Sequence, residues 1–589
     1  MKGVLKSGGV NEVYQKIRDN GPIIDSLINR NPMSPGHYPA WIESIEASSV
    51  RRKPNSGPVI SILMPIYKPN HQYLSEAIDS ILAQNYQSWE LCIHDDGSDE
   101  ADLSVQLAAW QKLDVRIKFA TGETNLGISD ATNRAARLAS GTYFTLMDQD
   151  DRIATDALSH IAEAISENPK AKLLYSDEDK LSATGERETP YFKPDFNYQL
   201  LLSQNYICHL VTFERTIFEQ VGGFRAGLDG AQDHDLILRI IERLTSEQIN
   251  HIPAILYHWR MHARSTATDV SAKPKALDAG KRAVRDHLNR KKIQATVEVT
   301  GIRYRVKYET PGDAKVTIII PTRNGAVILS RCIESILKLT DYRNYSILVV
   351  DNGSDDFATL QYLKSLSAQG IEVMVANQPF NFAALNNLAV NQSDADFVCL
   401  LNDDTEVISV GWLREMVSHA SQTNVGAVGA KLLYPDDTIQ HAGVILGVGG
   451  VAGHGHKHFG RNEDGYFSRL QVSQNLSAVT AACLLTKRSI WHEVGGMEER
   501  LAVAFNDIDF CIKLTSAGYS IVWTPWAELY HHESISRGYE STPEKQARFR
   551  QETEFMVDRW GPILAKDPHY NQHLTLKNES FMLRQPAEY

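Results

Sequence analysis

The chain repeats one pattern of apolar and polar positions. VISILMP (59–65) and VTIIIP (316–321) are β-rich apolar runs that each stop at a proline, which predicts buried strands of an α/β sheet. Apolar residues at positions i, i+3, i+4, i+7 and i+8 follow both runs, beginning at Leu74 and at Leu329, and this spacing predicts an amphipathic helix. A second apolar run comes next in both places, so each stretch is expected to begin strand, helix, strand.

The second apolar run ends in an acidic glycine turn in both places, HDDGSD and VDNGSD, and further motifs recur at equal distances. The proline that ends the first run and the glycine of the turn are 32 positions apart in both copies, from Pro65 to Gly97 and from Pro321 to Gly353. A helix asparagine and an aspartate of a later acidic motif are 17 positions apart, from Asn133 to Asp150 and from Asn387 to Asp404. An offset of about 255 residues is too long for a solenoid repeat. The sequence therefore predicts two homologous domains with right-handed crossovers.

The repeat continues into the C-terminal half of each copy, where VGGFRAGLDGAQDHDLILRI (221–240) matches VGGMEERLAVAFNDIDFCIKL (494–514). The second copy also carries an insertion rich in glycine and histidine at 439–460. We expect five parts: an N-terminal helical segment (1–54), a first domain (55–270), an ordered linker with a basic helical run (271–312), a second domain (313–545) and a C-terminal helical extension (546–589).

Composition narrows the class of protein. Of the 589 residues, 43% are hydrophobic and 22% charged, which is typical of a globular protein. The net charge of −12 argues against a nucleic-acid-binding protein, because phosphate binding needs a basic surface. The N-terminus lacks the apolar core of a secretory signal, no stretch approaches twenty apolar residues, and the six cysteines form no CxxC pair. A cytoplasmic protein with reduced thiols is expected.

FTLMDQDDRI (144–153) puts three carboxylates within four positions at the end of an apolar run. Such crowding is costly unless a cation or a solvated turn relieves it, and an Asp-rich turn is the simpler alternative. In an open parallel sheet, ligands bind beyond the carboxyl ends of the strands. Asp95, Asp96 and Asp148 to Asp151 are therefore expected to share one crevice, where carboxylates bind a nucleobase or ribose and Asp150 holds a divalent cation on phosphate oxygens.

A cation that also binds phosphate and water needs only one or two protein carboxylates. Histidine as a further ligand favours Mn²⁺ over Mg²⁺. The candidates are His262 in the first domain and His532 in the second, with His258 and His531 as close competitors. For each histidine alone, a surface or core position with satisfied hydrogen bonds is the alternative.

Transfer of a group to a hydroxyl acceptor also needs a general base. Asp233 in AQDHD and Asp507 in FNDID are matching acids that each precede a predicted helix. Capping of the helix N-terminus is the alternative role, but the recurrence in both copies favours the base. Asp235 and Asp509, two positions on, could hold the helix terminus instead.

Taken together, these motifs resemble the catalytic domain of glycosyltransferase family 2, twice over. The motifs that carry the resemblance are PIYKPN, DDGSD, NLGISDATNRA, LMDQDD, QDHD and WRMHARST in the first copy and PTRNG, DNGSD, FNFAALNN, LNDDT, NDID and HHESISRG in the second. The resemblance implies an α/β fold of two tandem GT-A domains, Rossmann-like, each with a mixed, mostly parallel sheet. It covers about four fifths of the chain.

The resemblance also implies roles for single residues. In the first copy Pro65, Tyr67 and Asp96, beside Asp95, would frame the nucleobase. Asp148 would bind the ribose, Asp150 would bind the metal, and Asp233 would be the inverting base. In the second copy Pro321, Asp351, Asp404 and Asp507 take those places. Two departures occur there: Asn402 begins the DxD pattern, where its amide can still bind a ribose, and Asn352 replaces Asp96.

The family further implies a bifunctional, Mn²⁺- or Mg²⁺-dependent inverting glycosyltransferase that extends a bacterial surface polysaccharide, O-antigen or capsule. Donors would be UDP-, dTDP- or GDP-sugars, and the acceptor a lipid-linked glycan, met at the inner face of the cell membrane by peripheral association. QHAG and GHGH in the second copy are similar to members assigned as rhamnosyltransferases. The alternative is one active domain with one degenerate binding domain. A nucleotidyltransferase is less expected, because the sequence has no Gly-rich basic phosphate loop. A non-catalytic scaffold is less expected, because both base candidates are present.

Two features have open interpretations. His441, His454, His456 and His458 could indicate zinc, but their spacing matches no strong pattern, and an acceptor loop is the expected role. YSDEDK (175–180) and FKPDFN (192–197) either shape an acceptor groove or are solvated loops.

Overall fold

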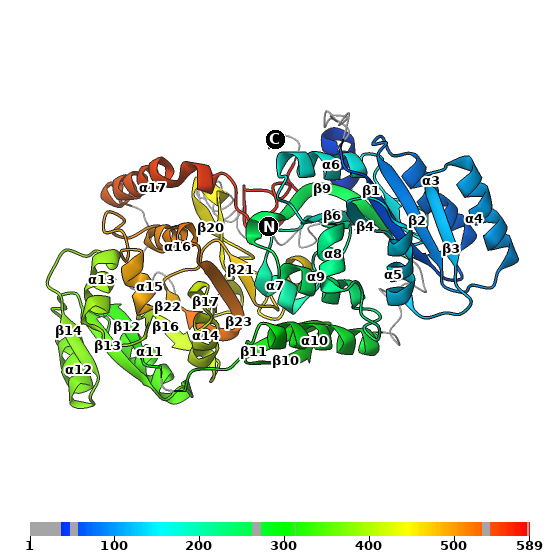
Figure 1. Ribbon diagram of the computed structural model, residues 1–589. Coiled ribbons are helices and arrows are strands. Elements are labelled where there is room, and N and C mark those ends of the chain that lie inside the picture. The colour runs from blue at the N-terminus through cyan, green and yellow to red at the C-terminus, as the bar shows by residue number, and fades with distance from the viewer. Residues whose placement is uncertain are drawn as a thin grey trace, which may run out of the picture. The chain divides into compact units, whose positions relative to one another are not determined.

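The computed structural model describes residues 37–46, 57–261, 273–312, 314–532, 542–585 and 588 (Figure 1). The chain divides into two compact units. The first unit comprises residues 35–309 together with 568–573, and the second comprises 310–567 together with 574–589. Each unit is built around one large sheet.

The first unit contains a nine-stranded sheet in the order β3-β2-β1-β4-β8-β6-β9-β5, with β7 paired to β6. Its strands are β1 (Ile60–Ile66), β2 (Trp89–Asp95), β3 (Ile117–Thr121), β4 (Tyr143–Leu146), β5 (Arg152–Ile153), β6 (Leu173–Leu181), β7 (Arg187–Tyr191), β8 (Val211–Glu214) and β9 (Ile249–Arg260). All strands except β5, β7 and β8 run in one direction. Both central strands, β1 and β2, are buried on both faces, as their unbroken apolar runs predict.

The helices of the first unit are α2 (His37–Trp41), α3 (His71–Leu82), α4 (Ala101–Leu113), α5 (Ile128–Leu138), α6 (Ala157–Glu167), α7 (Tyr198–Ser203), α8 (Arg215–Val221), α9 (Gln232–Ile241) and α10 (Lys273–Arg290). Short helical turns occupy Ile42–Glu46 and Ser246–Gln248, and β10 (Ala295–Thr300) and β11 (Arg303–Tyr308) form a separate hairpin. The buried stripe predicted on α3, beginning at Leu74, packs into the core beside β1 and β2. Figure 1 shows α3 and α4 along one side of these strands.

The second unit contains a ten-stranded sheet in the order β14-β13-β12-β15-β22-β17-β23-β16, with β18 paired to β17 and β21 to β23. Its strands are β12 (Val316–Thr322), β13 (Tyr345–Asp351), β14 (Glu372–Val375), β15 (Phe397–Leu401), β16 (Thr405–Val407), β17 (Val425–Leu433), β18 (Ile439–His441), β21 (Gln474–Leu476), β22 (Cys483–Lys487) and β23 (Ser520–His531). Its helices are α11 (Ala326–Leu339), α12 (Phe357–Ala368), α13 (Phe382–Gln392), α14 (Trp412–Ala420), α15 (Arg488–Glu493), α16 (Asn506–Ser516) and α17 (Pro543–Leu564).

The two sheets have the same strand order, position for position. Their registers agree as well, because Pro65 lies opposite His94 and Pro321 opposite Val350, each one residue before the end of the pairing. Two tandem α/β domains with mixed, mostly parallel sheets, as predicted, are therefore confirmed.

The insertion of the second copy leaves the main sheet. After β18, the chain forms a small hairpin of β19 (Val444–Leu446) and β20 (Ala452–His454), flanked by short 3-10 turns at Val448–Gly450 and Tyr466–Ser468. The chain then returns to the sheet as β21. Among the helices that the structure describes, none is long and apolar enough to span a bilayer.

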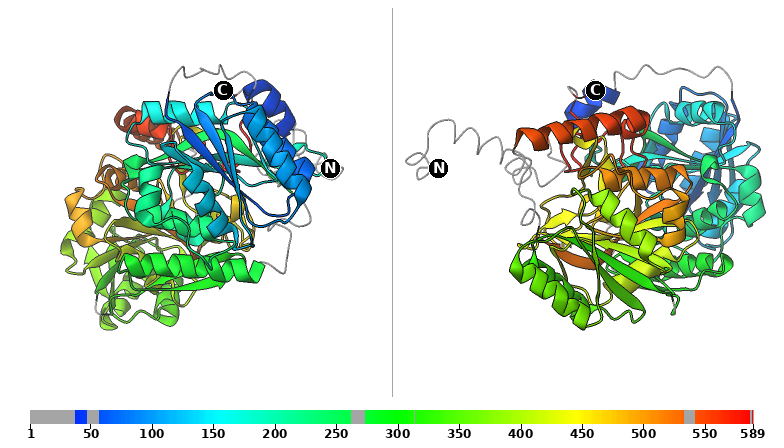
Figure 2. Two further views of the ribbon diagram at one scale, coloured as in Figure 1. Left: turned by 45° about the vertical axis from the view of Figure 1, so that its right-hand side comes forward. Right: turned by 90° about the vertical axis from the view of Figure 1, so that its left-hand side faces the viewer.

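Each unit has a long helix, α10 or α17, that packs near the helix with the candidate base. In the first unit α10 contacts α9, although we predicted residues 271–312 as a linker. In the second unit α17, red in Figure 2, contacts the segment that leads into α16 through Glu552 and contacts Asp509 of α16 through Trp560. The repeat therefore extends one helix further than the sequence motifs indicated.

Candidate active sites

The acidic turn after β2 is built by the side chains of its own sequence motif. Asp95 accepts hydrogen bonds from the backbone N–H of Ser98 (3.1 Å) and from its hydroxyl, and the Ser98 hydroxyl accepts the N–H of Lys68 (2.8 Å). The second unit repeats the arrangement: Asp351 accepts the N–H of Ser354 (3.0 Å), and the Ser354 hydroxyl accepts the N–H of Asn324 (3.0 Å). These contacts tie the loop after the first strand of each unit to the loop after the second.

The next residue of the motif braces a third loop. Asp96 is buried, and its carboxylate accepts the N–H groups of Leu126 (3.0 Å) and Gly127 (2.8 Å). Asn352 makes the opposite hydrogen bonds at the same place, since its amide donates to the carbonyls of Ala376 (2.9 Å) and Gln378 (2.8 Å). The Asn352 departure therefore preserves the loop while reversing the polarity of its hydrogen bonds.

Tyr67 lies at the mouth of the first site. Its ring is 41% exposed, and the Gln149 side chain holds its backbone by accepting its N–H (2.8 Å) and donating to its carbonyl (3.3 Å). Pro65, two residues earlier, is half-buried on β1. In the second unit, the residue that matches Gln149 is Asp403, which accepts the Thr322 hydroxyl (2.7 Å) next to Pro321.

The three carboxylates of the first acidic loop have different roles. Asp151 is buried and accepts the Tyr257 hydroxyl (2.5 Å) and the Arg260 N–H (2.7 Å), so it belongs to the fold. The Asp148 side chain keeps 41% of its surface exposed. Exclusion of water raises the pKa of Asp148 above its ordinary value, nearby His209 opposes the rise, and Asp150 and Asp233 add to it. Asp150 and Asp233 therefore lie near enough to Asp148 to affect its ionisation.

The second acidic loop brings an imidazole to its carboxylate. The Nε2 atom of His531 lies 3.1 Å from Asp404 Oδ1 and 3.2 Å from the Asn402 amide. The other ring nitrogen, Nδ1, contacts the Gln440 side-chain oxygen at 2.7 Å. His532, the histidine predicted for this role, lies with its Nε2 atom 3.1 Å from Glu406, while its backbone N–H donates to the carbonyl of Asp404 (2.9 Å).

The residues at this second loop fit a divalent cation. An amide oxygen can only accept, so the Gln440 contact puts the hydrogen of a neutral His531 on Nδ1. The Nε2 lone pair then accepts from the Asn402 amide nitrogen (3.2 Å) and lies 3.1 Å from Asp404 Oδ1. Ligand atoms about 2.1 Å from one ion and at right angles are about 3.0 Å apart, close to the 3.1 Å observed. In the described part of the chain, no three His, Cys, Asp or Glu side chains converge on one point, and His262 lies outside it.

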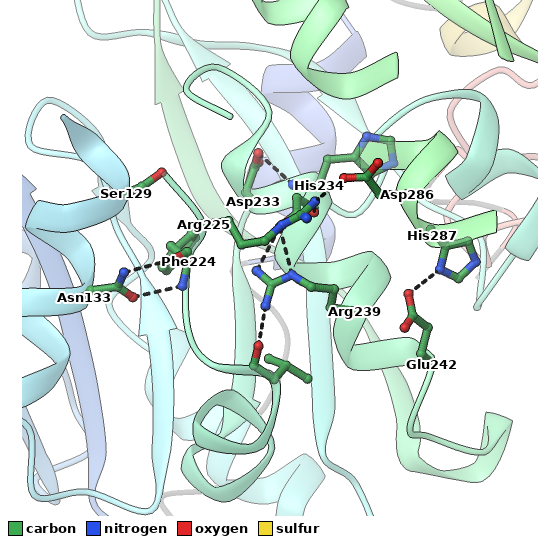
Figure 3. A network of polar contacts seen from close by, with 12 residues as sticks. Ser129, Asn133, Phe224, Arg225, Asp233, His234, Arg239, Glu242, Asp286 and His287 are labelled. Atoms are coloured by element: carbon green, nitrogen blue, oxygen red, sulfur yellow. Dashed lines mark hydrogen bonds and ion pairs between the residues drawn. The ribbon is translucent and has the colours of Figure 1, made fainter. Parts of the chain in front are cut away.

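The first base candidate stands at the start of α9. Asp233 accepts the side-chain amide of Asn205 (2.8 Å) and the N–H of His234 (2.9 Å). Asp235, two positions on, is fully buried and pairs with Arg239 (2.8 Å) and Arg225, which also binds Asp286 of α10 (3.0 Å; Figure 3). The arginines thus pair with the second acid of the motif and leave Asp233 to a neutral amide.

The second base candidate has a similar position on α16. Asp507 accepts the N–H groups of Ala481 (3.0 Å) and Ile508 (2.9 Å), and burial raises its pKa, against the lowering effect of these hydrogen bonds. Asp509 is fully buried and binds the indole of Trp560 (2.8 Å) and the Arg559 guanidinium (3.2 Å) from α17. The second acid therefore binds α17 directly in the second unit, whereas in the first unit it is linked to α10 through Arg225.

Sequence reasoning used Asn133 and Asn387 only to measure spacing. Asn133 binds both backbone atoms of Phe224, donating to its carbonyl and accepting its N–H at 2.9 Å each (Figure 3). Asn387 binds Met497 in the same way at the same distances. Each asparagine therefore anchors the Gly-Gly turn ahead of the base, and its recurrence in a polar position of an otherwise apolar helix face was the available signal.

The four insertion histidines have three separate environments. The Nδ1 atoms of His441 and His454 lie 3.0 Å apart, whereas His456 stacks on Phe581 (4.0 Å between ring centres) and His458 on Tyr434 (5.1 Å). No zinc site forms among them in the described residues. The stretches YSDEDK and FKPDFN are largely buried rather than solvated, and they carry the buried ion pair of Lys193 with Glu178 (2.8 Å).

Comparisons with known proteins agree with the doubled architecture. The sequence model of Glycosyl transferase family 2 matches residues 61–222 and again 317–490. An uncharacterized protein of Sinorhizobium fredii is 47% identical over 92% of the chain and 60% of its own length, and the O-antigen biosynthesis protein RfbC of Myxococcus xanthus is 35% identical over 95% of the chain and 44% of its own length. The chain thus spans about half the length of these relatives.

Similarity to solved structures is weak. The S. aureus protein TarS shares 17% identity with a TM-score of 0.32 over 39% of this chain and 40% of its own. GalNAc-T7, solved with UDP, GalNAc and Mn²⁺, shares 14% identity with a TM-score of 0.36 over 48% of this chain and 56% of its own. The double match of the family model, over more than half of the chain, decides the assignment: the chain belongs to Glycosyl transferase family 2, with one copy of the family domain in each unit.

Proposed function

We propose that the chain is a metal-dependent inverting glycosyltransferase with two active sites, one in each unit, that extends a bacterial surface polysaccharide from nucleotide-sugar donors. O-antigen is the polysaccharide favoured, because the relative from Myxococcus xanthus, matched over 95% of this chain, is named for O-antigen biosynthesis. UDP-, dTDP- and GDP-sugars are the candidate donors, and a lipid-linked glycan is the candidate acceptor.

One observation carries the proposal. Both units have an aspartate at a helix start, Asp233 or Asp507, that pairs with no basic side chain among the described residues. The neighbouring acid, Asp235 or Asp509, takes the arginine and tryptophan contacts instead. A purely structural role for the motif would need only one acid in each unit.

The residues divide the chemistry as follows. Asp233 and Asp507 accept the proton of the acceptor hydroxyl while its oxygen bonds to the anomeric carbon and the bond from that carbon to the donor diphosphate breaks. This single displacement inverts the anomeric configuration. Asp148 and Asn402 bind the ribose, and the turns that carry Asp95, Asp96 and Asp351 with Pro65, Tyr67 and Pro321 position the nucleobase.

A divalent cation, Mn²⁺ or Mg²⁺, would be held by Asp404 with His531 in the second unit and by Asp150 in the first. When bound, it would stabilise the charge that develops on the leaving diphosphate. We assign His531 rather than His532, because His531 is the histidine that faces Asp404. His262 stays a candidate ligand for the first unit, where Asp150 is the described carboxylate of that loop.

One active domain with a degenerate partner is the second candidate function. Asn402 and Asn352 stand in the second unit where the first has Asp148 and Asp96, so the second unit would be the degenerate one. The retained Asp507, Asp404 and His531 argue for activity there.

The test is donor turnover by the full chain with Mn²⁺, with Mg²⁺ and after chelation, across a panel of UDP-, dTDP- and GDP-sugars, for wild type, Asp233→Asn and Asp507→Asn. We expect each substitution to remove turnover of a different donor, with a loss of roughly 10²- to 10⁴-fold. Loss with only one substitution would establish the degenerate alternative. Donor binding without any turnover would disprove the catalytic proposal.

A further inference from the structure

His209 is a buried imidazole of the first unit that the predicted machinery does not use. It lies in the segment between α7 and β8, and only 9% of the residue is exposed. Its ring stacks on Tyr257, with ring centres 4.5 Å apart and planes 13° from parallel, and meets Trp259 edge-on. The imidazole plane is therefore held in one orientation by aromatic neighbours.

The backbone of His209 is held just as firmly. Its N–H donates to the Glu178 carboxylate (3.2 Å), and its carbonyl accepts from the ammonium group of Lys193, a side chain with no exposed surface. Lys193 and Glu178 also pair with each other at 2.8 Å. A buried ion pair is costly unless its remaining hydrogen bonds are satisfied, and here the backbone of His209 satisfies them.

The ring nitrogens, by contrast, make no hydrogen bond with any residue that the structure describes. Nδ1 is shielded from solvent and has no partner, and Nε2 lies 3.8 Å from Asp148 Oδ2, too far for a direct hydrogen bond. Buried polar groups are satisfied in nearly all proteins, and an exception persists where the surroundings enforce it, often at a functional site. The Nε2 edge faces Asp148, whose side chain is 41% exposed in the predicted donor crevice.

The separation of these two atoms suits a bridging hydroxyl group. An oxygen about 2.8 Å from each would fit between atoms 3.8 Å apart, donating its hydrogen to the carboxylate and bonding to the imidazole. Because the single hydrogen of the hydroxyl goes to the carboxylate, the ring carries its hydrogen on Nε2 and donates it to the hydroxyl oxygen. Resting on the proposed function, we infer that His209 and Asp148 together bind one sugar hydroxyl of the donor in the first site, and that His209 makes this recognition specific to that site.

At the position that matches His209, the second unit has an alanine. Tyr143 lies opposite Glu214 and Phe397 opposite Lys487 at matching places in the two sheets, so counting along the strands sets His209 against Ala482. The carbonyl of Ala482 accepts the N–H of Asn402, the counterpart of Asp148, which confirms that this segment lies at the same loop. The two sites therefore differ in side chain at this position as well, and this favours different donors.

The test uses the full chain with His209→Ala and His209→Gln, and with His160→Ala as the control, since His160 is a partly exposed histidine on α6 paired to Asp156. For each variant, kcat/KM is measured with two donors. The first donor is the one whose turnover Asp233→Asn removes, and the second donor is the one whose turnover Asp507→Asn removes. Dissociation constants of that first donor and of its free nucleoside diphosphate are measured alongside, with the melting temperature.

We expect His209→Ala to lower kcat/KM for the first donor roughly 10- to 100-fold, to leave the second donor within about twofold, and to be partly rescued by His209→Gln. If affinity for the nucleoside diphosphate falls too, the hydroxyl is that of the ribose. If only the sugar nucleotide binds less tightly, the hydroxyl belongs to the transferred sugar.

The inference is overturned if His209→Ala leaves kcat/KM and both affinities unchanged while the wild type turns over donor. It is equally overturned if both donors lose turnover together with a lower melting temperature, because the role is then structural. If the wild type binds donors without turning them over, the proposed function fails, and the two affinities still decide the role of His209.

Discussion

Most carboxylates at the two crevices serve the fold rather than a ligand. Asp95 and Asp96 hold backbone N–H groups of neighbouring loops, Asp151 holds the end of β9, and Asp235 holds two arginines. A carboxylate that accepts several backbone N–H groups is a strong loop anchor, because its hydrogen bonds are charge-assisted. The chemistry proposed for the first unit uses other acids, namely Asp148, Asp150 and Asp233.

Replacing Asn133 tests how much one side chain contributes to the base loop. Asn133→Ala removes two hydrogen bonds and leaves the N–H and carbonyl of Phe224 without partners, so we expect the free energy of unfolding of the first unit to fall by about 2 kcal/mol. Chemical denaturation, monitored by hydrogen exchange of the α9 amides, measures this free energy of unfolding. Asn168→Ala, which removes an exposed contact to Glu247, is the control and is expected to cost about 0.5 kcal/mol or less.

The raised pKa of Asp507 predicts a pH dependence. The base acts only when ionised, so turnover at the second site should fall as the pH is lowered through a value above the ordinary aspartate pKa of about 3.9. The measurement is kcat/KM against pH with the second-site donor. An acid limb at or below the ordinary value would contradict the burial of this carboxyl group.

The same shift has a consequence for stability, with a definite sign. A carboxyl group whose folded pKa is raised binds its proton more tightly in the folded state than in the unfolded one. As the pH rises from the ordinary pKa of Asp507 through its raised value, ionisation should therefore destabilise the second unit. Thermal unfolding of the second unit over this pH range checks the predicted destabilisation. A second unit that Asp507 makes more stable as the pH rises would refute it.

At the scale of elements, the closing helices α10 and α17 act as braces for the helices that carry the bases. Glu552 of α17 is 2% exposed and accepts the N–H groups of Val503 and Ala504 (3.0 Å each), directly ahead of α16. Asp286 of α10 reaches Asp235 of α9 through Arg225. The two helices use different side chains for one task.

Glu552→Ala should loosen the segment that leads to Asp507. Two buried N–H groups lose a charged acceptor, so we expect about 3 kcal/mol of destabilisation in the second unit and a loss of second-site turnover. Glu554→Ala on the exposed face of the same helix is the matched control and should change neither. Both variants are measured by denaturation and by donor turnover. If Glu552→Ala and Glu554→Ala change stability and turnover equally, the contact made by Glu552 is unimportant.

At the scale of the whole molecule, chain order and compact units do not coincide. Residues 568–573 follow α17 yet belong to the first unit, where the Asn571 amide donates to the Asp177 carboxylate (3.0 Å) and the Lys193 carbonyl (2.8 Å). The backbone N–H of Asp195 donates to the Pro568 carbonyl (2.8 Å). This short segment therefore completes a buried polar network of the first unit.

Two truncations separate the role of this segment from that of the residues after it. A chain ending at Asp567 should lose hydrogen-exchange protection in β6 and first-site turnover, because Asp177 and Lys193 are buried and lose a partner. A chain ending at His573 keeps the segment and should retain both. If the two truncated chains show the same protection in β6, the segment does not support the first unit.

Much of this architecture was predictable because it depends on local patterns. Strand runs that end at Pro65 and Pro321, the stripe from Leu74, and the doubled spacing of the acidic motifs all follow from side-chain periodicity, which a single sequence displays. The closing helices were read as linker and extension, since α10 is strongly polar and its partner face depends on contacts with a distant segment.

The sequence by itself determined the two α/β domains, their strand–helix–strand beginnings and the places of the acidic motifs, because periodicity and spacing act over a few neighbouring residues. Only the tertiary structure decided which acids anchor loops, that His209 faces Asp148, and that His531 rather than His532 meets Asp404. Adjacent residues of a strand point to opposite faces, so the pairing of Thr405 with His531 selects the histidine that enters the site, and such registers arise only when distant strands meet.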